Sequence, residues 1–257
     1  MFVLEHVGQG WGIRYLDIIF EEFSQLNFDD VRLFVEINDR IGGPNKFDLY
    51  SSKYNLIVHG SPTSLRYIYH AMLILTHYQD ISTHTSHGHD AMVEVGCGYG
   101  GLFLALNYFS KFFNVQIPSY HLIDLPEACE LIRYYLDQHQ ATISIPYHIH
   151  SASDYGKDVV PAAPFVVEPS SETVQNLPGY LFFISNYCLT ELDEIHRQQY
   201  RKHLLPKARH GFVIWQTQFL GGHHVFDVLG LEDHVSTIQR MEKERPDFSY
   251  GNFFLYY

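Results

Sequence analysis

The chain has 257 residues, of which 46% are hydrophobic and 18% are charged, and its formal net charge is -12 at pH 7. This composition is typical of a folded globular protein and excludes a largely disordered chain. The negative balance argues against a nucleic-acid partner, because phosphate binding needs clustered Lys and Arg side chains.

The first 89 residues show the three- and four-residue spacing of apolar side chains that indicates helices. We expect helices over residues 15–26, 29–41 and 62–79, with Ser61 and Pro62 at the start of the third. Residues 41–54 are rich in turn-forming residues. We therefore predict a helical cap or lid over residues 1–89.

From residue 90 on, short apolar strands alternate with helices. We expect strands over 91–95, 120–125, 143–152, 179–186 and 211–217, helices over 101–112, 126–139 and 192–204, and a closing hairpin of 235–241 with 252–257. Repeated strand–helix units imply a mostly parallel sheet that is covered on both faces. Residues 90–257 are therefore predicted to form one α/β domain.

The strongest local signal is the glycine-rich loop after the first of these strands, Glu94-Val-Gly-Cys-Gly-Tyr-Gly-Gly101. Glycines permit a tight turn from strand to helix and let a ligand approach the backbone. Gly96, Gly98 and Gly101 also satisfy the dinucleotide pattern G-x-G-x-x-G, which is weak evidence on its own. An acid two residues before the first glycine is instead typical of S-adenosylmethionine loops, where it suits the ammonium group of the ligand. A purely structural turn is the third interpretation.

Asp124, followed by Leu125, lies at the end of the second expected strand. A carboxylate there can accept hydrogen bonds from both ribose hydroxyls of a nucleotide. It can equally act as the N-cap of the helix that begins near Pro126, and the two roles are compatible. Ser153 and Asp154, after the third strand, are placed where such folds recognise the adenine amino group, although Asp154 could simply begin a turn.

Four segments together resemble the sugar O-methyltransferase family of bacterial and viral glycan loci. They are Glu36-Ile-Asn-Asp-Arg-Ile-Gly-Gly-Pro44, Ser61-Pro-Thr-Ser-Leu-Arg-Tyr67, Glu94-Val-Gly-Cys-Gly-Tyr-Gly-Gly101 and Ser185-Asn-Tyr-Cys-Leu-Thr-Glu-Leu192. Their order and approximate spacing follow the family. Cys97 and Cys188 lie at variable positions of the pattern, and the tail after Phe219 matches only loosely.

The resemblance implies an α/β fold with a Rossmann-like methyltransferase sheet of seven strands, mostly parallel with the last strand antiparallel, after an N-terminal helical cap. It implies S-adenosyl-L-methionine as the cofactor and a hydroxyl of a sugar as the acceptor of the methyl group. The expected acceptor is a deoxysugar of a glycan. The cofactor-binding set is Glu94, Gly96, Gly98, Tyr99, Gly100, Asp124, Leu125, Ser153, Asp154, Ser185 and Asn186. The substrate-binding set is Asn38, Asp39, Arg66, Tyr67 and Tyr187, and packing of the cap is the alternative for the first four.

A sugar hydroxyl is a poor nucleophile at neutral pH, so a general base or a metal would help the transfer. Glu191 is the first candidate base, and its alternative is a helix N-terminal acid with Thr190 as the cap. His223 and His224, after two glycines, are the next candidates, and solvated loop residues are their alternative. A divalent metal is possible, but no ligand spacing indicates one.

Two other functions stay open at this point: a nicotinamide-dependent sugar oxidoreductase, and a non-catalytic glycan-binding subunit with the same fold. The sequence contains no apolar stretch of about 18 residues and no basic–apolar leader after Met1, so we expect a cytoplasmic protein without a membrane span. Three scattered cysteines, Cys97, Cys129 and Cys188, indicate neither a disulfide framework nor a zinc site. Whether the chain forms a dimer is left open.

Overall fold

A computed structural model of the chain describes residues 7–84, 88–151, 177, 179–192, 194–216, 240–245 and 252–257. These residues belong to two compact units, which are described separately. The helical unit is drawn from residues 1–84, 98–116 and 134–144, and the sheet unit from residues 85–97, 117–133 and 145–257. The first break, after His84, lies near the predicted end of the cap, but two later segments also belong to the helical unit.

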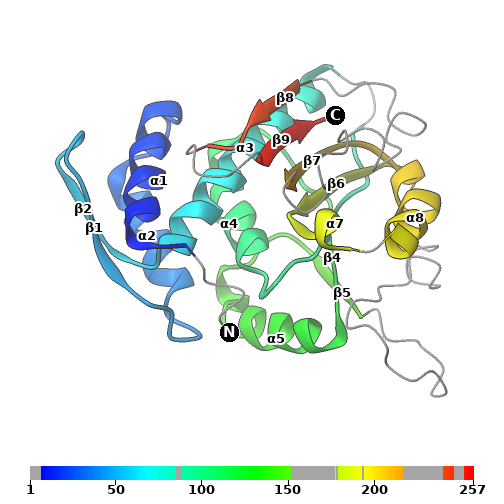
Figure 1. The fold of residues 1–257 in the computed structure, drawn as a ribbon, viewed down its shortest axis with the longest axis horizontal. Helices are drawn as coiled ribbons and strands as arrows, with labels where there is room; N and C mark the ends of the chain where they lie inside the picture. Colours follow the sequence, from blue (N-terminus) through cyan, green and yellow to red (C-terminus); the bar gives the residue numbers. More distant parts are fainter. Residues whose placement is uncertain are drawn as a thin grey trace. The chain divides into compact units, whose positions relative to one another are not determined.

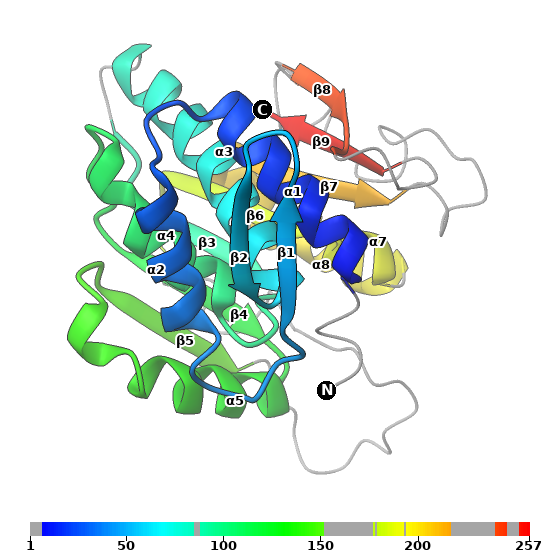
Figure 2. The same cartoon turned by 90° about the vertical axis from the view of Figure 1, so that its left-hand side faces the viewer.

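The helical unit consists of helices and one hairpin. Its elements are α1 (Gln9–Glu22), α2 (Phe28–Asn38), β1 (Phe47–Ser51), β2 (Leu56–Gly60), α3 (Pro62–His84), α4 (Gly101–Phe109), and the 3-10 turns Ser110–Phe112 and Gln140–Thr142. Helix α3 contacts α1, α2 and α4, and the hairpin lies against α1 and α2 (Figure 2). Because α3 is covered on several sides, it is buried along most of its length.

Local sequence explains where these helices begin. The side chain of Asn27 accepts a hydrogen bond from the backbone N–H of Asp30 at 2.9 Å, which is an N-cap for α2. Thr63 N donates to Ser61 Oγ at the start of α3, so the predicted helix start at Ser61 and Pro62 is confirmed. The three expected N-terminal helices are all present, with ends that differ from the predicted ones by up to six residues.

The hairpin β1–β2 was not predicted. Its strands pair antiparallel with Leu49 opposite Val58, and both of these side chains are buried. The alternation that marks a strand is only five residues long on each side, and the turn before it contains Gly42, Gly43 and Pro44, which favoured a loop. Asn55, with φ of 53°, closes the hairpin.

Among the described residues of the sheet unit, seven strands form one sheet in the order β5-β4-β3-β6-β7-β9-β8 (Figure 1, with β3 labelled in Figure 2). The strands are β3 (Ala91–Val95), β4 (Tyr120–Asp124), β5 (Tyr147–Ser151), β6 (Leu181–Asn186), β7 (Ala208–Gln216), β8 (Arg240–Lys243) and β9 (Asn252–Tyr256). Strands β3 to β7 pair in parallel, and β9 is antiparallel to both of its neighbours. The predicted α/β sheet of seven strands, mostly parallel with an antiparallel last strand, is confirmed.

One face of this sheet is an apolar core. Alternate residues of the central strands, including Val93, Val95 and Phe183, pack with Trp215 of β7 and Tyr200 of α8 (Glu194–His203). The short helix α7 (Cys188–Glu191) and the 3-10 turn Leu205–Lys207 also contribute side chains to this cluster. Helix α5 (Pro126–Asp137) begins in the sheet unit and ends in the helical unit. None of the described helices is long and apolar enough to cross a membrane.

Candidate functional site

The strand register of the sheet unit places three polar side chains on one face at the carboxyl ends of adjacent strands. Glu94 of β3 lies opposite Leu122 of β4 and Ile184 of β6. Asp124 and Asn186 come two residues later on those two strands, so they point to the same face as Glu94. The sheet face opposite to the apolar core therefore carries two carboxyl groups, of Glu94 and Asp124, and the carboxamide of Asn186. They lie at the edge where α/β sheets bind ligands.

Gly96 follows β3 between Asp124 and Asn186, and only a glycine fits there. Its φ is 80°, and a Cβ atom built on it would lie 2.3 Å from the Cβ of Cys188. Its backbone N–H donates to the carbonyl oxygen of Ile123 at 3.0 Å, which holds the turn against β4. Gly98 and Gly100 also have positive φ, of 61° and 90°, and Gly100 is the N-cap residue of α4. The predicted tight turn from strand to helix is confirmed.

Glu94 is buried, with 2% of its surface exposed. Its carboxylate accepts a hydrogen bond from the hydroxyl of Tyr120 at 2.8 Å, and no ion pair joins it to another described residue. Burial, opposed by this hydrogen bond and reinforced by the charge of Asp124, raises the pKa of Glu94 to about 8. The carboxyl group is therefore protonated at neutral pH in the free protein, and a cation bound beside it would lower this pKa and favour the ionised form.

Asp124 is the last residue of β4 and is partly exposed. One carboxylate oxygen, Oδ1, accepts a hydrogen bond from the backbone N–H of Leu125 at 2.7 Å. Helix α5 begins two residues later, at Pro126, so a role at the start of this helix and a role in ligand binding both remain compatible with the position.

The end of β6 is held in a constrained conformation. Tyr187 has φ of 68°, which is uncommon for a residue with a side chain, and its hydroxyl donates to the buried carboxylate of Glu244. Asn252 donates to the other oxygen of Glu244 at 2.7 Å, and Thr190 Oγ1 donates to the carbonyl oxygen of Tyr187 at 2.6 Å. The backbone beside Asn186 is thus fixed from both sides.

Ser185 and Asn186, the two residues before Tyr187, differ in their hydrogen bonding. Ser185 is fully buried, and its hydroxyl donates to the carbonyl oxygen of Val95 at 3.3 Å, which ties β6 to β3. The Oδ1 atom of Asn186 is buried but accepts no hydrogen bond from any residue that the structure describes. Since buried polar atoms are nearly always paired, an unpaired one at a sheet edge needs an explanation.

Glu191 is an exposed residue at the end of α7, and partial desolvation raises the pKa of its carboxyl group. The alternative in which Thr190 caps the following helix is wrong. Thr190 lies inside α7 and is buried, and α8 does not begin until Glu194. The four-residue helix α7 was not foreseen because it is too short to show a periodic pattern.

Four predicted substrate-binding residues lie in the helical unit, and two of them form a saturated polar cluster. The carboxylate of Asp39 accepts hydrogen bonds from Ser61 N and Ser64 Oγ, both at 2.5 Å. The carboxamide of Asn38 donates to Ser64 Oγ at 2.7 Å and accepts from the Tyr135 hydroxyl at 2.6 Å. Both side chains are 3% exposed and join the end of α2 to the start of α3.

Arg66 and Tyr67 lie in the first turns of α3, close to this cluster in the chain. Arg66 is 7% exposed, and its guanidinium lies 5.8 Å from the ring centre of Tyr67. The rings of Tyr67 and Tyr99 meet edge to face at 5.6 Å, and a Cβ atom on Gly101 would lie 2.5 Å from the Tyr67 ring. These contacts support the alternative in which the predicted substrate-binding residues of the helical unit pack the cap.

Four predicted site residues, Ser153, Asp154, His223 and His224, lie outside the described residues. Conversely, sequence reasoning missed Tyr120, Ser64, Tyr135, Glu244 and Asn252, which hold the residues named above. The two-residue period of the second strand could have placed Tyr120 beside Glu94. No local signal identifies Glu244 or Asn252.

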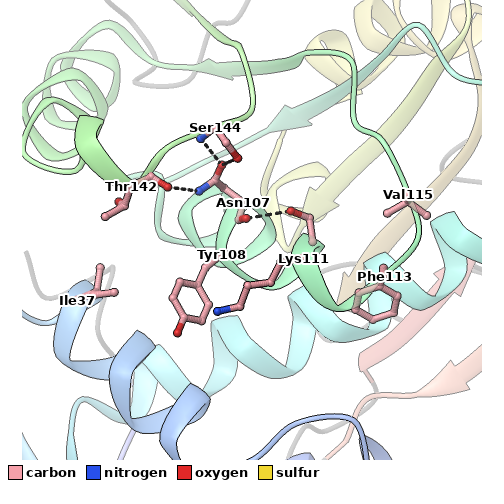
Figure 3. Close-up of a pocket in the computed structure, with 9 residues that line it drawn as sticks. Ile37, Asn107, Tyr108, Lys111, Phe113, Val115, Thr142 and Ser144 are labelled. Carbon is pink, nitrogen blue, oxygen red and sulfur yellow. Dashed lines mark hydrogen bonds between the residues drawn. The ribbon is translucent and has the colours of Figure 1, made fainter.

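A cavity of about 480 Å³ lies in the helical unit (Figure 3). Asn107 is at its centre, where Nδ2 donates to the carbonyl oxygen of Thr142 at 2.9 Å and Oδ1 accepts from Ser144 N at 2.8 Å. The Lys111 ammonium lies 3.9 Å from the ring centre of Tyr108. None of the predicted site residues lines this cavity, which is at the end of α4 that is remote from the glycine loop.

Within the described part of the chain, no three His, Cys, Asp or Glu side chains are grouped so that they could hold a metal ion. His121, His148 and His150 do lie together on β4 and β5, with the His121 and His150 rings stacked at 5.1 Å. The Nδ1 atom of His121 lies 2.8 Å from Nε2 of His150, so these two ring nitrogens contact each other.

No protein-family model and no curated protein sequence matches the chain. Solved structures with a similar fold include magnesium protoporphyrin IX methyltransferase from Synechocystis with bound S-adenosylmethionine, at 14% identity and a TM-score of 0.49, covering 95% of each chain. An O-methyltransferase from Bacillus cereus in complex with S-adenosylhomocysteine gives 8% identity and a TM-score of 0.45, covering 93% of this chain and 94% of that one.

The pyocyanin biosynthetic protein PhzM gives 15% identity and a TM-score of 0.40 over 70% of this chain, and the chain spans 53% of that protein. At these identities and TM-scores, the similarities assign neither a substrate nor a residue's role to this chain.

Proposed function

We propose that this chain is an S-adenosylmethionine-dependent O-methyltransferase that transfers a methyl group to a hydroxyl of a sugar. The observation that carries the proposal is the set of Asp124, Glu94 and Asn186 on one face of β4, β3 and β6, beside a glycine turn with no room for a side chain. Carboxylates and an amide oxygen on one face suit a ligand with ribose hydroxyls and a positive charge.

The strand order favours this cofactor over a nicotinamide dinucleotide. Dinucleotide-binding sheets run in the order 3-2-1-4-5-6 with parallel strands. Here an antiparallel strand, β9, is inserted between β7 and β8, which are the fifth and sixth strands of the sheet in chain order. The oxidoreductase alternative also needs a pyrophosphate at the loop, which would be compatible only with the neutral form of Glu94, whereas the ionised form suits a cation.

Each residue has a definite part in the proposed reaction. The cofactor, when bound, supplies a methyl group on a positively charged sulfur, so the transfer needs alignment more than activation of the leaving group. Asp124 would accept hydrogen bonds from the ribose hydroxyls, and Glu94 would offset the positive charge of the ligand. Glu191 would accept the proton of the sugar hydroxyl, and its raised pKa makes it a better base than an ordinary carboxylate. His223 and His224 are the alternative bases.

The sugar acceptor is supported by the resemblance of four chain segments to sugar O-methyltransferases. The net charge of -12 is consistent with an uncharged acceptor rather than with a nucleic acid. Substrate contacts from Asn38, Asp39, Arg66, Tyr67 and Tyr187 remain part of this proposal, although each of these side chains already has partners within the protein.

Calorimetric titration with S-adenosylmethionine and S-adenosylhomocysteine tests the proposal. We expect micromolar binding by the wild type and a loss of at least about a hundredfold in Asp124→Ala, since two hydrogen bonds to a charged group are removed. Asp137→Ala, an exposed acid at the other end of α5, is the matched control and should bind normally. Transfer of labelled methyl groups to deoxysugar glycosides then tests the acceptor.

Each outcome of these titrations separates the candidate functions. Binding of NAD with no response to either sulfur compound would replace the proposal with the oxidoreductase. Tight cofactor binding without methyl transfer to any glycoside would contradict the sugar acceptor and leave the cofactor site intact.

A further inference from the structure

The β8–β9 pair contains a buried carboxylate that holds two neighbouring side chains. Glu244, which directly follows β8, is 5% exposed, and its backbone N–H donates to the carbonyl oxygen of Asn252 at 2.9 Å. Its Oε1 atom accepts a hydrogen bond from the hydroxyl of Tyr187, and its Oε2 atom accepts one from Asn252 Nδ2 at 2.7 Å. Both carboxylate oxygens are therefore engaged by donors.

This pairing decides which end of the Asn252 carboxamide faces away from Glu244. A carboxylate accepts hydrogen bonds but donates none, so only the amide nitrogen of Asn252 can face it. The Oδ1 atom must then point away from Glu244. Asn252 is 6% exposed, and this buried oxygen accepts no hydrogen bond from any residue that the structure describes. Since buried polar atoms are nearly always paired, the oxygen needs a donor that these residues do not supply.

The strand register places Asn252 on the sheet face opposite to the apolar core, which also carries the proposed cofactor site. Asn252 is the first residue of β9 and lies opposite Gln216, the last residue of β7. Asn186 lies opposite Ile214, two residues before Gln216. Residues two apart on a strand point to the same face, so the side chains of Asn186 and Asn252 share one face at the carboxyl edge of the sheet.

Asn252 is remote from the proposed ribose contact. It lies four strands along the sheet from Asp124 and two residues further in the strand direction. At about 4.8 Å per strand and about 3.3 Å per residue, the two Cα atoms are about 20 Å apart. The amino-acid end of the cofactor is joined to its ribose by a short chain through the sulfur, which does not cover this distance. A ligand group at Asn252 would therefore belong to the methyl acceptor.

We propose that Asn252, oriented by Glu244, is a specificity residue that accepts a hydrogen bond from a hydroxyl of the acceptor sugar, at a position other than the methylated one. This rests on the proposed function, because it assigns a second contact to the same acceptor. A neutral amide oxygen binds a hydroxyl and discriminates against a group without a proton, such as fluorine. Glu244 is a positioning residue, because it acts only by fixing which atom Asn252 presents.

Titration of the full-length protein, loaded with S-adenosylhomocysteine, tests the contact from the ligand side. The probes are methyl α-L-rhamnoside, methyl α-L-fucoside and analogues of each in which one hydroxyl at a time is replaced by fluorine. We expect one fluorinated position to weaken binding to the wild type about three- to tenfold, which corresponds to one lost hydrogen bond. In Asn252→Ala the same fluorination should have no further effect. The affinity of this variant for S-adenosylhomocysteine should change less than about twofold, which shows that it is folded.

Glu244→Gln tests the positioning role with a measurement that a mere loss of stability would not change. A glutamine amide can donate as well as accept, so the carboxamide of Asn252 can turn its nitrogen outward. We therefore expect the penalty for the fluorinated glycoside to fall below about twofold in this variant. Glu242→Gln, the same substitution at an exposed position two residues earlier, is the matched control and should keep the wild-type penalty.

The other outcomes would overturn the inference. A fluorine penalty that persists in Asn252→Ala would assign the hydroxyl to another residue, and no penalty at any position would leave the Asn252 oxygen to an internal water. A wild-type penalty in Glu244→Gln would remove the positioning role. Binding of S-adenosylhomocysteine without binding of either glycoside would contradict the sugar acceptor and this inference with it. Failure to bind S-adenosylhomocysteine would contradict the proposed function itself, which distinguishes the two failures.

Discussion

The two units each contain a cluster of buried polar side chains, and the clusters differ in how their hydrogen-bonding atoms are used. In the helical unit, Asn38 and Asp39 share short hydrogen bonds with Ser61, Ser64 and Tyr135. At the edge of the sheet unit, Glu94 has no cationic partner among the described residues, and Asn186 Oδ1 has no donor there. The first cluster satisfies its own hydrogen bonds and stabilises the fold, whereas the second leaves the Asn186 oxygen unpaired beside the proposed cofactor site.

The largest effect on stability should come from breaking the saturated cluster. Asp39→Ala leaves Ser61 N and Ser64 Oγ without their acceptor at the start of α3, so we expect the free energy of unfolding to fall by about 3 kcal/mol. Urea denaturation measures this loss. The affinity of the folded variant for S-adenosylhomocysteine should change less than about twofold.

Asp39→Asn is the control that keeps the shape of the side chain. It retains one acceptor oxygen, so the free energy of unfolding should fall less than in Asp39→Ala. A stable Asp39→Ala protein that had lost methyl transfer would contradict the structural role and restore Asp39 to the acceptor site.

Gly96→Ala should have the next largest effect, now at the sheet edge. The added Cβ would lie 2.3 Å from Cys188 Cβ, and the positive φ is unfavourable for alanine, so we expect a loss of about 2 kcal/mol in unfolding free energy. Thermal unfolding measures it. Adding Cys188→Gly removes the clash but not the backbone strain, so the double variant should recover only part of the loss. Full recovery would show that φ at residue 96 costs nothing.

The pH dependence of cofactor binding should follow Glu94. In the free protein its raised pKa, about 8, keeps the carboxyl group protonated at neutral pH, and a bound ammonium group favours the ionised form. Affinity for S-adenosylhomocysteine should therefore rise between pH 6 and pH 8, by up to about tenfold per pH unit. Glu94→Gln should remove this slope. Calorimetry in buffers of different ionisation enthalpy should detect release of about one proton at pH 7.

The same group should affect stability with a definite sign. Because the pKa of Glu94 is higher in the folded than in the unfolded chain, its contribution to stability is present below the unfolded pKa, about 4.3, and is lost as the pH rises to about 8. The melting temperature of the free wild type should thus fall relative to that of Glu94→Gln between pH 5 and pH 8. A melting-temperature difference that does not change with pH would show that the carboxyl group of Glu94 does not titrate in this range.

The smallest effect should come from a polar contact that belongs to neither cluster. Lys53 Nζ lies 2.9 Å from the carboxylate of Glu21, and both side chains are about half exposed. Lys53→Met should leave the urea midpoint and ligand binding unchanged within error, since exposed ion pairs contribute little. A clear loss would show that exposure is a poor guide to the importance of polar contacts in this chain.

Much of the sheet was predictable because its signals are local. Apolar runs gave the order of strands and helices, and the turn at Gly96 follows from residues that are adjacent in the chain. The hairpin of β1 and β2 was missed because each strand is short and faces its partner only after a turn. The network around Asn38 was also out of reach, because it joins residues up to 97 positions apart.

The sequence by itself determined the strand–helix alternation, the glycine turn and the acids at the strand ends, since each depends on neighbours in the chain. Only the tertiary structure decided which polar groups find a partner. Asn38 and Asn186 are the same residue type, yet α3 and Tyr135 complete the hydrogen bonds of the first, and no described residue completes those of the second. Pairing depends on distances between elements that are remote in sequence, and no local pattern encodes those distances.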